Sequence, residues 1–380
     1  HLTNSMAYQI CSKTVMDNIA DPDIRFDADG VCNYYHAFIQ KLKIRVPEPE
    51  LAKQQLDKLV AAIKKAGKGK QYDCIIGVSG GVDSTYVAWL VKELGLRPLA
   101  VHLDNGWNSE LAVKNIERLL QHLQIDLYTE VLDWETFRDL QWSFLQASTP
   151  DAEIPTDHII FATLYKVAAR FGVQYILSGM NFRSEGMLPP SWARGHLDWK
   201  YIRSVQQQFG SKSIRHLPHL SVARFLYYNL VLRIKNVGIL NYVPFRKDEA
   251  MAIIQEKLGY RPYEGKHHES IYTRFFQSYI LPNKFGIDKR KAHLSCLIMS
   301  TGEVSREQAL AMLQQPPQAE LQSHRDRLFV IKKLGISEAQ FDAMMAAPVK
   351  SILDYPNHYR LEQLFRQKLN VLRAKGWFPN

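Results

Sequence analysis

The stretch that most restricts the fold is 74-CIIGVSGGVDSTYVAWL-90. Apolar residues typical of a buried strand lead into two glycines, after which a helical pattern begins. The backbone amides at such a junction point beyond the sheet, and glycine lets an anion approach them closely. The N-terminus of the following helix adds about half a positive charge. The stretch therefore predicts a phosphate-binding turn; the alternative is a helix N-cap that binds nothing.

The side chains of this turn indicate what kind of anion it holds. Ser79 and Ser84 add hydroxyl donors, whereas Asp83 repels phosphate directly and is better placed to hold Mg²⁺ bridging to it. The Gly-Lys-Ser/Thr ending of a Walker loop is absent, and the spacing does not fit the dinucleotide fingerprint either. A polyphosphate with Mg²⁺ at Asp83 is thus expected. The expected nucleotide contacts in the turn are Ser79, Gly80, Gly81, Val82 and Ser84.

Apolar strand-like segments alternate with helical ones over the first half of the chain. Continuous apolar strands separated by helices predict an α/β fold with a doubly wound parallel sheet, covered on both faces. The expected strands lie at 72–79, 97–104, 125–133 and 173–179, with helices at about 50–66, 84–94 and 109–124 and helices up to 172. We expect residues 1–6 to be a cloning remnant, followed by an N-terminal module (7–50), the nucleotide-binding core (51–185), a substrate-binding insertion with a late catalytic block (186–302) and a helical C-terminal region (303–380). Ser305 with Gln308 and Ser337 with Gln340 form two capping-box patterns in that last region.

Polar residues follow two of the other expected strands. Ligands of open α/β sheets lie beyond the carboxyl ends of the strands. His102, Asp104 and Asn105 at the end of the second strand are therefore expected to border the adenosine, although an ordinary strand-ending turn is the alternative. Gly179 closes another strand at the same edge.

Several polar residues are candidates for contact with the substrate rather than the nucleotide. Asn181 and Glu185 follow Gly179, and further candidates are Asp157, His158, His267 and Glu269. The run His267–Glu269 is either a metal-binding fragment, a proton-transfer group or a satisfied hydrogen-bond network.

The composition of the chain narrows the classes of binding partner to be expected. The formal net charge of +10 favours an anionic partner such as a nucleotide, a nucleotide-linked sugar, RNA or an acidic protein. We take the charge as spread along the chain, which argues against RNA. Four cysteines and no evident signal peptide favour a reducing cytoplasm. The most apolar stretch, 217–243, is interrupted by charged residues, so a buried helix is favoured over contact with a membrane.

The hexapeptide Ser79–Ser84 after an apolar strand resembles the PP-loop of the N-type ATP pyrophosphatases, which include asparagine synthetases, NAD synthetases and tRNA thiolases. The resemblance implies that ATP is cleaved between its α- and β-phosphates. A carbonyl or amide oxygen is then adenylated, and a nitrogen or sulfur nucleophile displaces AMP.

Further stretches resemble the bacterial N-acetyl sugar amidotransferases of O-antigen and LPS biosynthesis. The matching stretches are 11-CSKTVMDNIADPDIRFDADGVCNYY-35, 101-VHLDNGWNSELAV-113, 155-PTDH-158, 178-SGMNFRSEG-186 and 267-HHESIYTRFFQSYILPNKFGIDKRKAHLS-295. This family converts an acetamido group of a nucleotide-linked sugar into an acetamidino group. The resemblance implies that Lys284 and Lys289 stabilise the leaving pyrophosphate; the alternative is solvated surface charge.

The chain departs from this family at the N-terminus. Members commonly carry two Cys-x-x-Cys pairs, typical of a zinc site. Here Thr14 and Tyr35 replace the second cysteine of each pair, which leaves Cys11 and Cys32, with His36 next to the second pair. Whether the N-terminal module binds zinc stays open. If it does not, apolar packing must hold the module together. The available side chains are Val15, Met16, Ile24, Phe26 and Val31.

No cysteine is placed like a glutaminase nucleophile. Cys74 and Cys296 lie in apolar stretches, and Cys11 is not the first residue of the expected native chain. The resemblance therefore implies a separate glutaminase subunit that supplies ammonia. Two other functions stay open: a tRNA-thiolating enzyme on the same fold, and a non-catalytic relic.

Overall fold

The computed structural model describes residues 7–263, 268–360 and 364. Its centre is a sheet of five parallel strands in the order β3-β2-β1-β4-β5. The strands are β1 (Cys74–Gly77), β2 (Pro98–Asp104), β3 (Asp126–Val131), β4 (Tyr175–Ser178) and β5 (Lys235–Gly238). The predicted α/β fold with a parallel sheet is confirmed, and the first four strands lie within the predicted segments.

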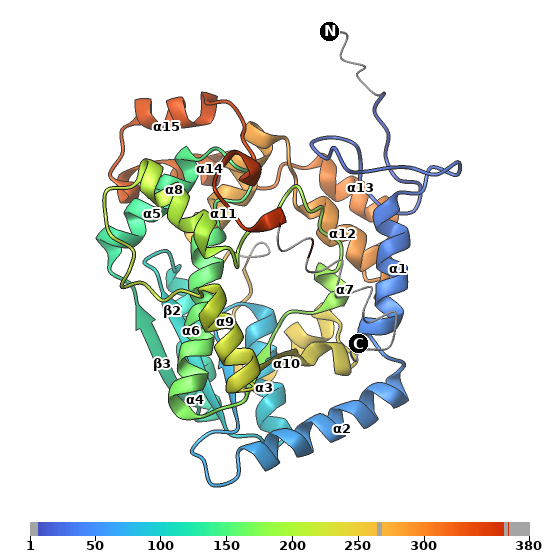
Figure 1. The fold of residues 1–380 in the computed structure, drawn as a ribbon. Helices are drawn as coiled ribbons and strands as arrows, with labels where there is room; N and C mark the ends of the chain where they lie inside the picture. The colour runs from blue at the N-terminus through green and yellow to red at the C-terminus, as the bar shows by residue number, and fades with distance from the viewer. Residues whose placement is uncertain (1–6, 264–267, 361–363, 365–380) are drawn as a thin grey trace.

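Helices cover both faces of this sheet (Figure 1). Along the core these are α2 (Pro49–Ala66), α3 (Val82–Glu93), α4 (Glu110–Leu123), α5 (Trp134–Gln146), α6 (Ile154–Phe171), α7 (Phe182–Glu185), α8 (Trp199–Phe209), α9 (Val222–Leu226) and α10 (Lys247–Leu258). The leader and the late part contain α1 (Asn33–Arg45), α11 (Ile271–Phe275), α12 (Arg290–Met299), α13 (Arg306–Gln314), α14 (Glu320–Leu334) and α15 (Glu338–Ala346). Two π-helices, η1 (Tyr227–Val231) and η3 (Phe276–Phe285), and two 3₁₀ helices, η2 (Ile239–Tyr242) and η4 (Ile352–Asp354), complete the described elements.

The side chains of β1 show why both faces must be covered. Cys74 and Ile76 point into a core shared with α3, α4 and α10, whereas Ile75 points into a second core built on α6. Alternate residues of a strand face opposite sides of a sheet, so a strand that is apolar at every position needs a layer on each side.

The strand order also positions the site. β1 has β2 on one side and β4 on the other, so the connections leave the sheet in opposite directions at this point. A crevice opens between such diverging connections at the carboxyl ends of the strands. The turn at 79–84 follows β1 directly, and Gly179 follows β4.

A separate large core joins the leader to the late helices. Met16 and Ile24 are buried together with Phe275 and Val330, which come from α11 and α14. Figure 1 shows α1 on the same side of the molecule as α12 and α13. The apolar packing expected of the leader is confirmed: Val15, Met16, Ile24 and Val31 are buried and Phe26 is partly buried. Both predicted capping boxes are present, at α13 and α15.

The interpretation of 217–243 as a buried helix is wrong. The segment contains α9, η1, β5 and η2, and neither α9 nor η1 has a buried residue. β5 was missed as a strand because it begins with the polar residues Lys235 and Asn236, so it lacks the continuous apolar run of the other strands. Among the described residues, no helix combines the length and the apolar character that crossing a membrane requires.

Candidate functional site

The turn between β1 and α3 is tight and needs its glycines. Gly80 has φ +83°, and a Cβ atom there would lie 2.7 Å from the carbonyl oxygen of Ala112. The Ser79 N–H donates to Ser84 Oγ at 3.2 Å, and the two hydroxyl oxygens are 3.2 Å apart. The loop is thus folded over the first turn of α3 with its hydroxyls and amides gathered at one place, as an anion-binding turn requires.

The loops that follow β1 and β4 meet at this turn. A Cβ atom on Gly179 would lie 3.1 Å from the carbonyl carbon of Asp83, a tight contact that would force one of the two backbones to shift slightly. His102, at the end of β2, lies with Nδ1 2.8 Å from the Val78 carbonyl oxygen and Nε2 3.1 Å from Asn108 Nδ2. Gly179 and His102 therefore both lie beside the turn at 79–84.

A second carboxylate lies over the turn. A Cβ atom on Gly81 would be 2.8 Å from Glu269 Oε1, and the Glu269 carbonyl accepts from Ser109 N–H at 2.8 Å. Burial raises the pKa of Tyr260, and the charges of Glu269 and Asp83 raise it further, so both carboxylates lie within electrostatic reach of one hydroxyl. The Tyr263 hydroxyl, which the sequence analysis missed, donates to the Gly80 carbonyl at 2.9 Å.

These donors fit the Mg²⁺ ion that the PP-loop implies. Magnesium prefers one or two carboxylates completed by phosphate oxygens and water. Asp83 and Glu269 are two such carboxylates beside an anion-binding turn. Two negative side chains at that position would repel a polyphosphate unless a cation lies between them and the phosphates.

The loop after β2 connects the turn to α6. Asn105 is buried; its Nδ2 donates to Thr156 Oγ1 at 3.2 Å and its Oδ1 accepts from the Trp107 N–H at 3.2 Å. Asp104 accepts from the Gly106 N–H at 3.0 Å. Both predicted residues therefore fix the loop that borders the expected adenosine position.

Lys333 holds the same loop from the far end of the chain. It belongs to α14, its ammonium group donates to the Gly106 carbonyl, and it lies 5.2 Å and 5.0 Å from the ring centroids of Trp107 and Trp134. A cation over aromatic faces is attracted by their quadrupoles. Nothing local in the sequence could have paired Lys333 with a loop 227 positions earlier.

Acidic residues around the start of α6 surround Lys289. Lys289 Nζ lies 3.4 Å from Glu153 Oε2, and Gln277 Nε2 donates to the same oxygen at 2.9 Å. Burial alone would lower the pKa of Lys289, but the charges of Glu153, Asp151 and Asp157 outweigh it and raise that pKa. Lys289 is therefore a charged residue of this acidic cluster, and 22% of its side chain is exposed.

Two carboxyl groups of the cluster, those of Asp151 and Asp157, bind a proton more readily than usual because their pKa values are raised. Burial raises the pKa of Asp151 to about 6 and that of Asp157 well above its ordinary value. Asp157 is nevertheless accessible to solvent. Asp157 is thus the member of the cluster that solvent reaches, whereas Asp151 and Glu153 are buried.

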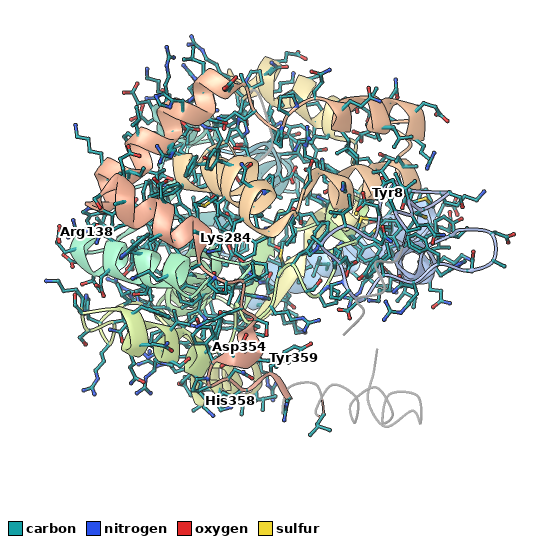
Figure 2. All side chains as sticks on the ribbon, turned by 90° about the horizontal axis from the view of Figure 1, so that it is seen from above. Tyr8, Arg138, Lys284, Asp354, His358 and Tyr359 are labelled. Atoms are coloured by element: carbon teal, nitrogen blue, oxygen red, sulfur yellow. The ribbon has the colours of Figure 1, made fainter. Side chains whose placement is uncertain are left out.

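Lys284 is not placed as predicted. Its ammonium group donates to the Met344 carbonyl at α15 and lies 5.7 Å from the Phe285 ring centroid, beside the C-terminal helices (Figure 2). Burial lowers its pKa to about 8. The prediction treated neighbouring lysines of one block as equivalent, but η3 ends between Lys284 and Lys289 and directs them to different surroundings.

His158 is a buried structural residue and not a substrate contact. It has no exposed surface; its Nδ1 lies 2.7 Å from the His196 carbonyl oxygen, and its Nε2 accepts from the Leu220 N–H at 3.0 Å. Burial lowers its pKa to about 4, so the ring is neutral. Both nitrogens are engaged by the backbone, which corrects the prediction.

The remaining predicted substrate residues differ in position. Asn181 is buried and caps α7, accepting from the Ser184 N–H at 3.0 Å and from the Ser184 hydroxyl at 2.9 Å. Glu185 is exposed at the other end of α7. His267 lies outside the described residues.

The leader does not gather the ligands of a zinc site. Cys32 N–H donates to Cys11 Sγ at 3.2 Å, and the Thr14 hydroxyl lies 3.9 Å from Cys32 Sγ. His36 is instead paired with Asp27 at 2.8 Å. In the described part of the chain no group of three metal-ligating side chains converges. Because tetrahedral zinc needs four donors, the residues present do not fit it.

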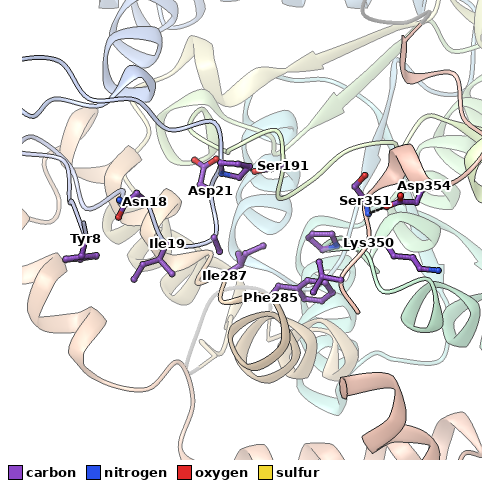
Figure 3. A pocket seen from close by; sticks show the side chains of 14 residues that line it. Tyr8, Asn18, Ile19, Asp21, Ser191, Phe285, Ile287, Lys350, Ser351 and Asp354 are labelled. Atoms are coloured by element: carbon purple, nitrogen blue, oxygen red, sulfur yellow. Dashed lines mark hydrogen bonds between the residues drawn. The ribbon is translucent and has the colours of Figure 1, made fainter. Parts of the chain in front are cut away.

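Two neighbouring cavities lie where the leader meets the late block. The larger, about 820 Å³, is lined by Asp21, Ser191, Phe285 and Lys350 among others (Figure 3). The smaller, about 250 Å³, shares four lining residues with it and reaches Asp151 of the acidic cluster. Asp21 is buried, and within the described residues its Oδ2 atom makes no hydrogen bond. The cavities therefore connect the leader side of the molecule with the cluster around Lys289.

Comparisons with known proteins find similarity over parts of the chain. A glutamine-hydrolyzing GMP synthase of Pyrobaculum aerophilum is 35% identical over 107 residues, 28% of this chain and 20% of that protein. A tRNA-specific 2-thiouridylase of Clostridioides difficile is 29% identical over 121 residues, 28% of this chain and 34% of that protein. The chain spans between 20% and 46% of the length of the curated relatives it matches.

Among solved structures, an NMN synthetase from Francisella tularensis is similar over 57% of this chain and 89% of that one, at 18% identity and a TM-score of 0.28. At that score the likeness adds nothing to the topology described above. Residues 269–368 match the family described as "LPS biosynthesis protein WbpG-like, C-terminal domain". The matched segment begins at Glu269, which lies over the phosphate-binding turn, and includes Lys289 of the acidic cluster. The late part of this chain is therefore similar to the C-terminal domain of the WbpG-like LPS biosynthesis proteins.

Proposed function

We propose that the protein is an ATP-dependent amidotransferase acting on an acetamido group of a nucleotide-linked sugar. The product is an acetamidino sugar for LPS and O-antigen synthesis. AMP and pyrophosphate are the other products.

One observation carries the proposal. The segment that matches the WbpG-like family supplies one residue to each half of the candidate site: Glu269 to the phosphate-binding turn and Lys289 to the acidic cluster. We therefore infer that the late part of the chain completes the nucleotide site and contributes to a second site for the acceptor. That is what an enzyme needs if it joins ATP chemistry to a family-specific acceptor.

The proposed reaction has two steps, one for each half of the candidate site. The amide oxygen of the acetamido group attacks the α-phosphate of ATP, and pyrophosphate leaves from the turn at 79–84. Ammonia then attacks the imidate carbon, AMP departs with the former amide oxygen, and a proton is released. Mg²⁺ held by Asp83 and Glu269 would neutralise charge on the phosphates.

The cluster around Lys289 suits the second step. Ammonium must lose a proton before its nitrogen can attack. Asp157 is exposed to solvent and its pKa is raised, as is the pKa of Asp151, so at neutral pH each accepts a proton more readily than an ordinary carboxylate. Lys289 stays charged and lies 3.4 Å from the Glu153 carboxylate.

The larger cavity suits a sugar ring. Cavities of this size accept small ligands, and Asp21 and Ser191 can hydrogen-bond hydroxyl or amide groups while Tyr8 and Phe285 offer apolar ring faces. Its aspartates would repel a diphosphate, so the nucleotide part of the substrate lies outside it. We infer that the source of ammonia is a separate glutaminase chain and that the reaction takes place in the cytoplasm.

The test is a reaction with purified protein, ATP, Mg²⁺, ammonium and a panel of nucleotide-linked diacetamido sugars. Mass spectrometry should show a sugar lighter by the difference between an oxygen atom and an NH group, together with AMP and pyrophosphate. Formation of ADP and phosphate would contradict the proposal.

A tRNA-modifying enzyme is the second candidate, because a thiouridylase is among the relatives. It requires RNA binding whose affinity falls steeply with salt, and transfer of sulfur to tRNA. If both are absent while the sugar reaction occurs, this candidate is eliminated.

A further inference from the structure

The positive charge of the chain is concentrated in one segment. Residues 199–247 contain nine lysine and arginine residues and no aspartate or glutamate, so they carry nine of the ten net positive charges of the protein. The expectation that the charge is spread along the chain is therefore wrong. This segment begins at α8 and ends at the first residue of α10.

Most of these basic side chains are available. Seven are exposed, and among the described residues none of the seven forms an ion pair with a carboxylate. They are Lys200, Arg203, Lys212, Arg215, Arg224, Arg233 and Lys235. A cluster of exposed, unneutralised cations attracts a polyanionic surface.

The same segment exposes a row of large apolar side chains. Val222, Leu226 and Leu230 are four residues apart along α9 and η1, and Tyr227 and Val231 lie next to them. All five are between 48% and 70% exposed. We call these five residues the 222–231 stripe. Exposed apolar side chains that lie together mark a site of interaction.

The opposite side of this helical segment is anchored, so the exposure is a property of the folded protein. Tyr228 stacks on Tyr165 of α6 with ring centroids 5.7 Å apart, and the Tyr165 hydroxyl donates to Asn229 Oδ1 at 3.3 Å. Phe225 and Leu232 also pack against the α6 core. Figure 1 shows α9 beside α6, on the outer side of the sheet. The helix is therefore held with its apolar stripe directed away from the core.

The combination favours a lipid surface over RNA or a protein. RNA would use the cations and the ring of Tyr227, because single strands stack on aromatic rings, but it gains nothing from the two valines and two leucines of the stripe. A stable protein interface needs about 800 Å² per partner, whereas the stripe is one helix wide and about 15 Å long at 1.5 Å per residue. A helix with exposed aliphatic residues and nearby basic ones is typical of proteins that lie in the bilayer interface. Here Arg224 lies on the helical segment, and Arg233 and Lys235 follow it.

We propose that residues 199–247 dock the protein on an anionic membrane surface. The 222–231 stripe enters the boundary between headgroups and acyl chains, and the seven basic side chains meet the lipid phosphates. This inference does not depend on the proposed enzymatic function.

Co-sedimentation of the full chain with lipid vesicles tests the proposal. The vesicles contain phosphatidylcholine alone or with about one-third phosphatidylglycerol, an anionic fraction that creates a strong surface potential. We expect the protein to sediment with the anionic vesicles and not with the neutral ones, and to be released by added salt. Absence from the anionic pellet at low salt would overturn the proposal.

Matched variants distinguish binding through the 222–231 stripe from binding through any exposed apolar side chain. Leu226→Glu with Leu230→Glu should lower the partition coefficient at least about tenfold, because two apolar anchors are lost and two like charges face the lipid. Leu321→Glu with Leu328→Glu, on α14 and of comparable exposure, should bind like the wild type. Equal losses in both pairs would overturn the assignment to 222–231.

A second pair of substitutions keeps the proposal testable if the first pair fails to fold. Arg215→Gln with Arg224→Gln removes charge without touching the stripe, and should weaken binding to anionic vesicles and reduce its dependence on salt. Thermal unfolding of every variant checks the fold. Salt-sensitive binding to single-stranded RNA without binding to vesicles would assign the basic segment to RNA and overturn the proposal.

Discussion

At the scale of single residues, His158 shows how burial decides the role of a titratable group. Its ring is enclosed, and backbone groups lie at both nitrogens. The folded pKa of about 4 lies below the usual value of 6.5, so the unfolded chain binds the proton more readily. The stability that this group contributes is therefore complete above about pH 6.5 and is lost as the pH falls through 4.

His158→Gln should therefore flatten the dependence of stability on pH. The wild type loses about 3 kcal/mol through this residue between pH 7.5 and pH 4, at 1.36 kcal/mol per unit of pKa. The difference in free energy of unfolding between wild type and variant, measured by urea denaturation, should shrink by about that amount. If the difference stays constant while the KM for the sugar rises, His158 contacts substrate after all.

Asp83→Asn should remove the response to ATP with Mg²⁺. The substitution keeps the size of the side chain but removes the charge that holds the cation, so AMP formation should fall at least about 100-fold. The upward shift of the thermal midpoint on adding ATP with Mg²⁺ should disappear. Asp342→Asn, on exposed α15, is the control and should behave like the wild type. A normal shift in Asp83→Asn would remove this residue from the metal site.

Residues close in sequence could be predicted together, and residues far apart could not. The turn at 79–84 was evident because two glycines, two serines and an aspartate follow one strand. Glu269 was a candidate, but its position over Gly81 depends on a contact 188 positions away, which no local pattern encodes. Asp151 and Glu153 were missed although they flank the matching stretch at 155–158; charged residues before a helix usually indicate a solvated N-terminus.

At the scale of elements, α14 reaches back to the nucleotide side of the sheet. Lys333 donates to the Gly106 carbonyl and lies over aromatic rings, so it positions the loop after β2 without touching the nucleotide. Lys333→Met keeps the aliphatic stem and removes the donor. We expect the KM for ATP to rise about tenfold, or ~1.4 kcal/mol for a hydrogen bond to a charged group, with little change in kcat.

The control for this positioning role is Lys332→Met on the same helix. Lys332 is exposed and its substitution should leave the KM for ATP unchanged. If Lys333→Met lowers the thermal midpoint but not the affinity for ATP, the residue stabilises α14 and has no part in positioning the loop.

The leader should be insensitive to metal removal. Its residues do not present four zinc donors, whereas Met16 and Val15 are fully buried. Incubation with a chelator should therefore leave the thermal midpoint unchanged, while Met16→Ala should cost about 2–5 kcal/mol by leaving a cavity. A stoichiometric zinc content that is lost together with stability would show that the leader still binds metal.

The elements predicted best are those whose apolar residues form a continuous run or recur with a strict helical period. β1 to β4 and α2 to α4 were predicted within a few residues, because their apolar patterns are continuous or strictly helical. β5 and the helical segment at 222–231 were not, for opposite physical reasons. β5 is short and polar at the sheet edge, and the aliphatic residues at 222–231 suggested burial although the fold leaves them in solvent.

At the scale of the whole molecule, the protein should use ammonia and not glutamine by itself. The described cysteines are all buried, so none is placed as a glutaminase nucleophile. Purified chain should form AMP with high ammonium and stay near background with glutamine. Addition of a cognate glutaminase subunit should restore the glutamine reaction. Equal rates with glutamine and ammonium for the isolated chain would show that it contains its own glutaminase.

The complete burial of Cys11, Cys32, Cys74 and Cys296 has a practical consequence. No sulfur atom should be accessible to a thiol reagent in the native state. The rate of the labelling reaction therefore measures how often the structure opens. Cys11 and Cys32 report on the core that joins leader and late helices, and Cys74 reports on the sheet. The order in which these thiols are labelled would reveal whether the two cores open together or one after the other.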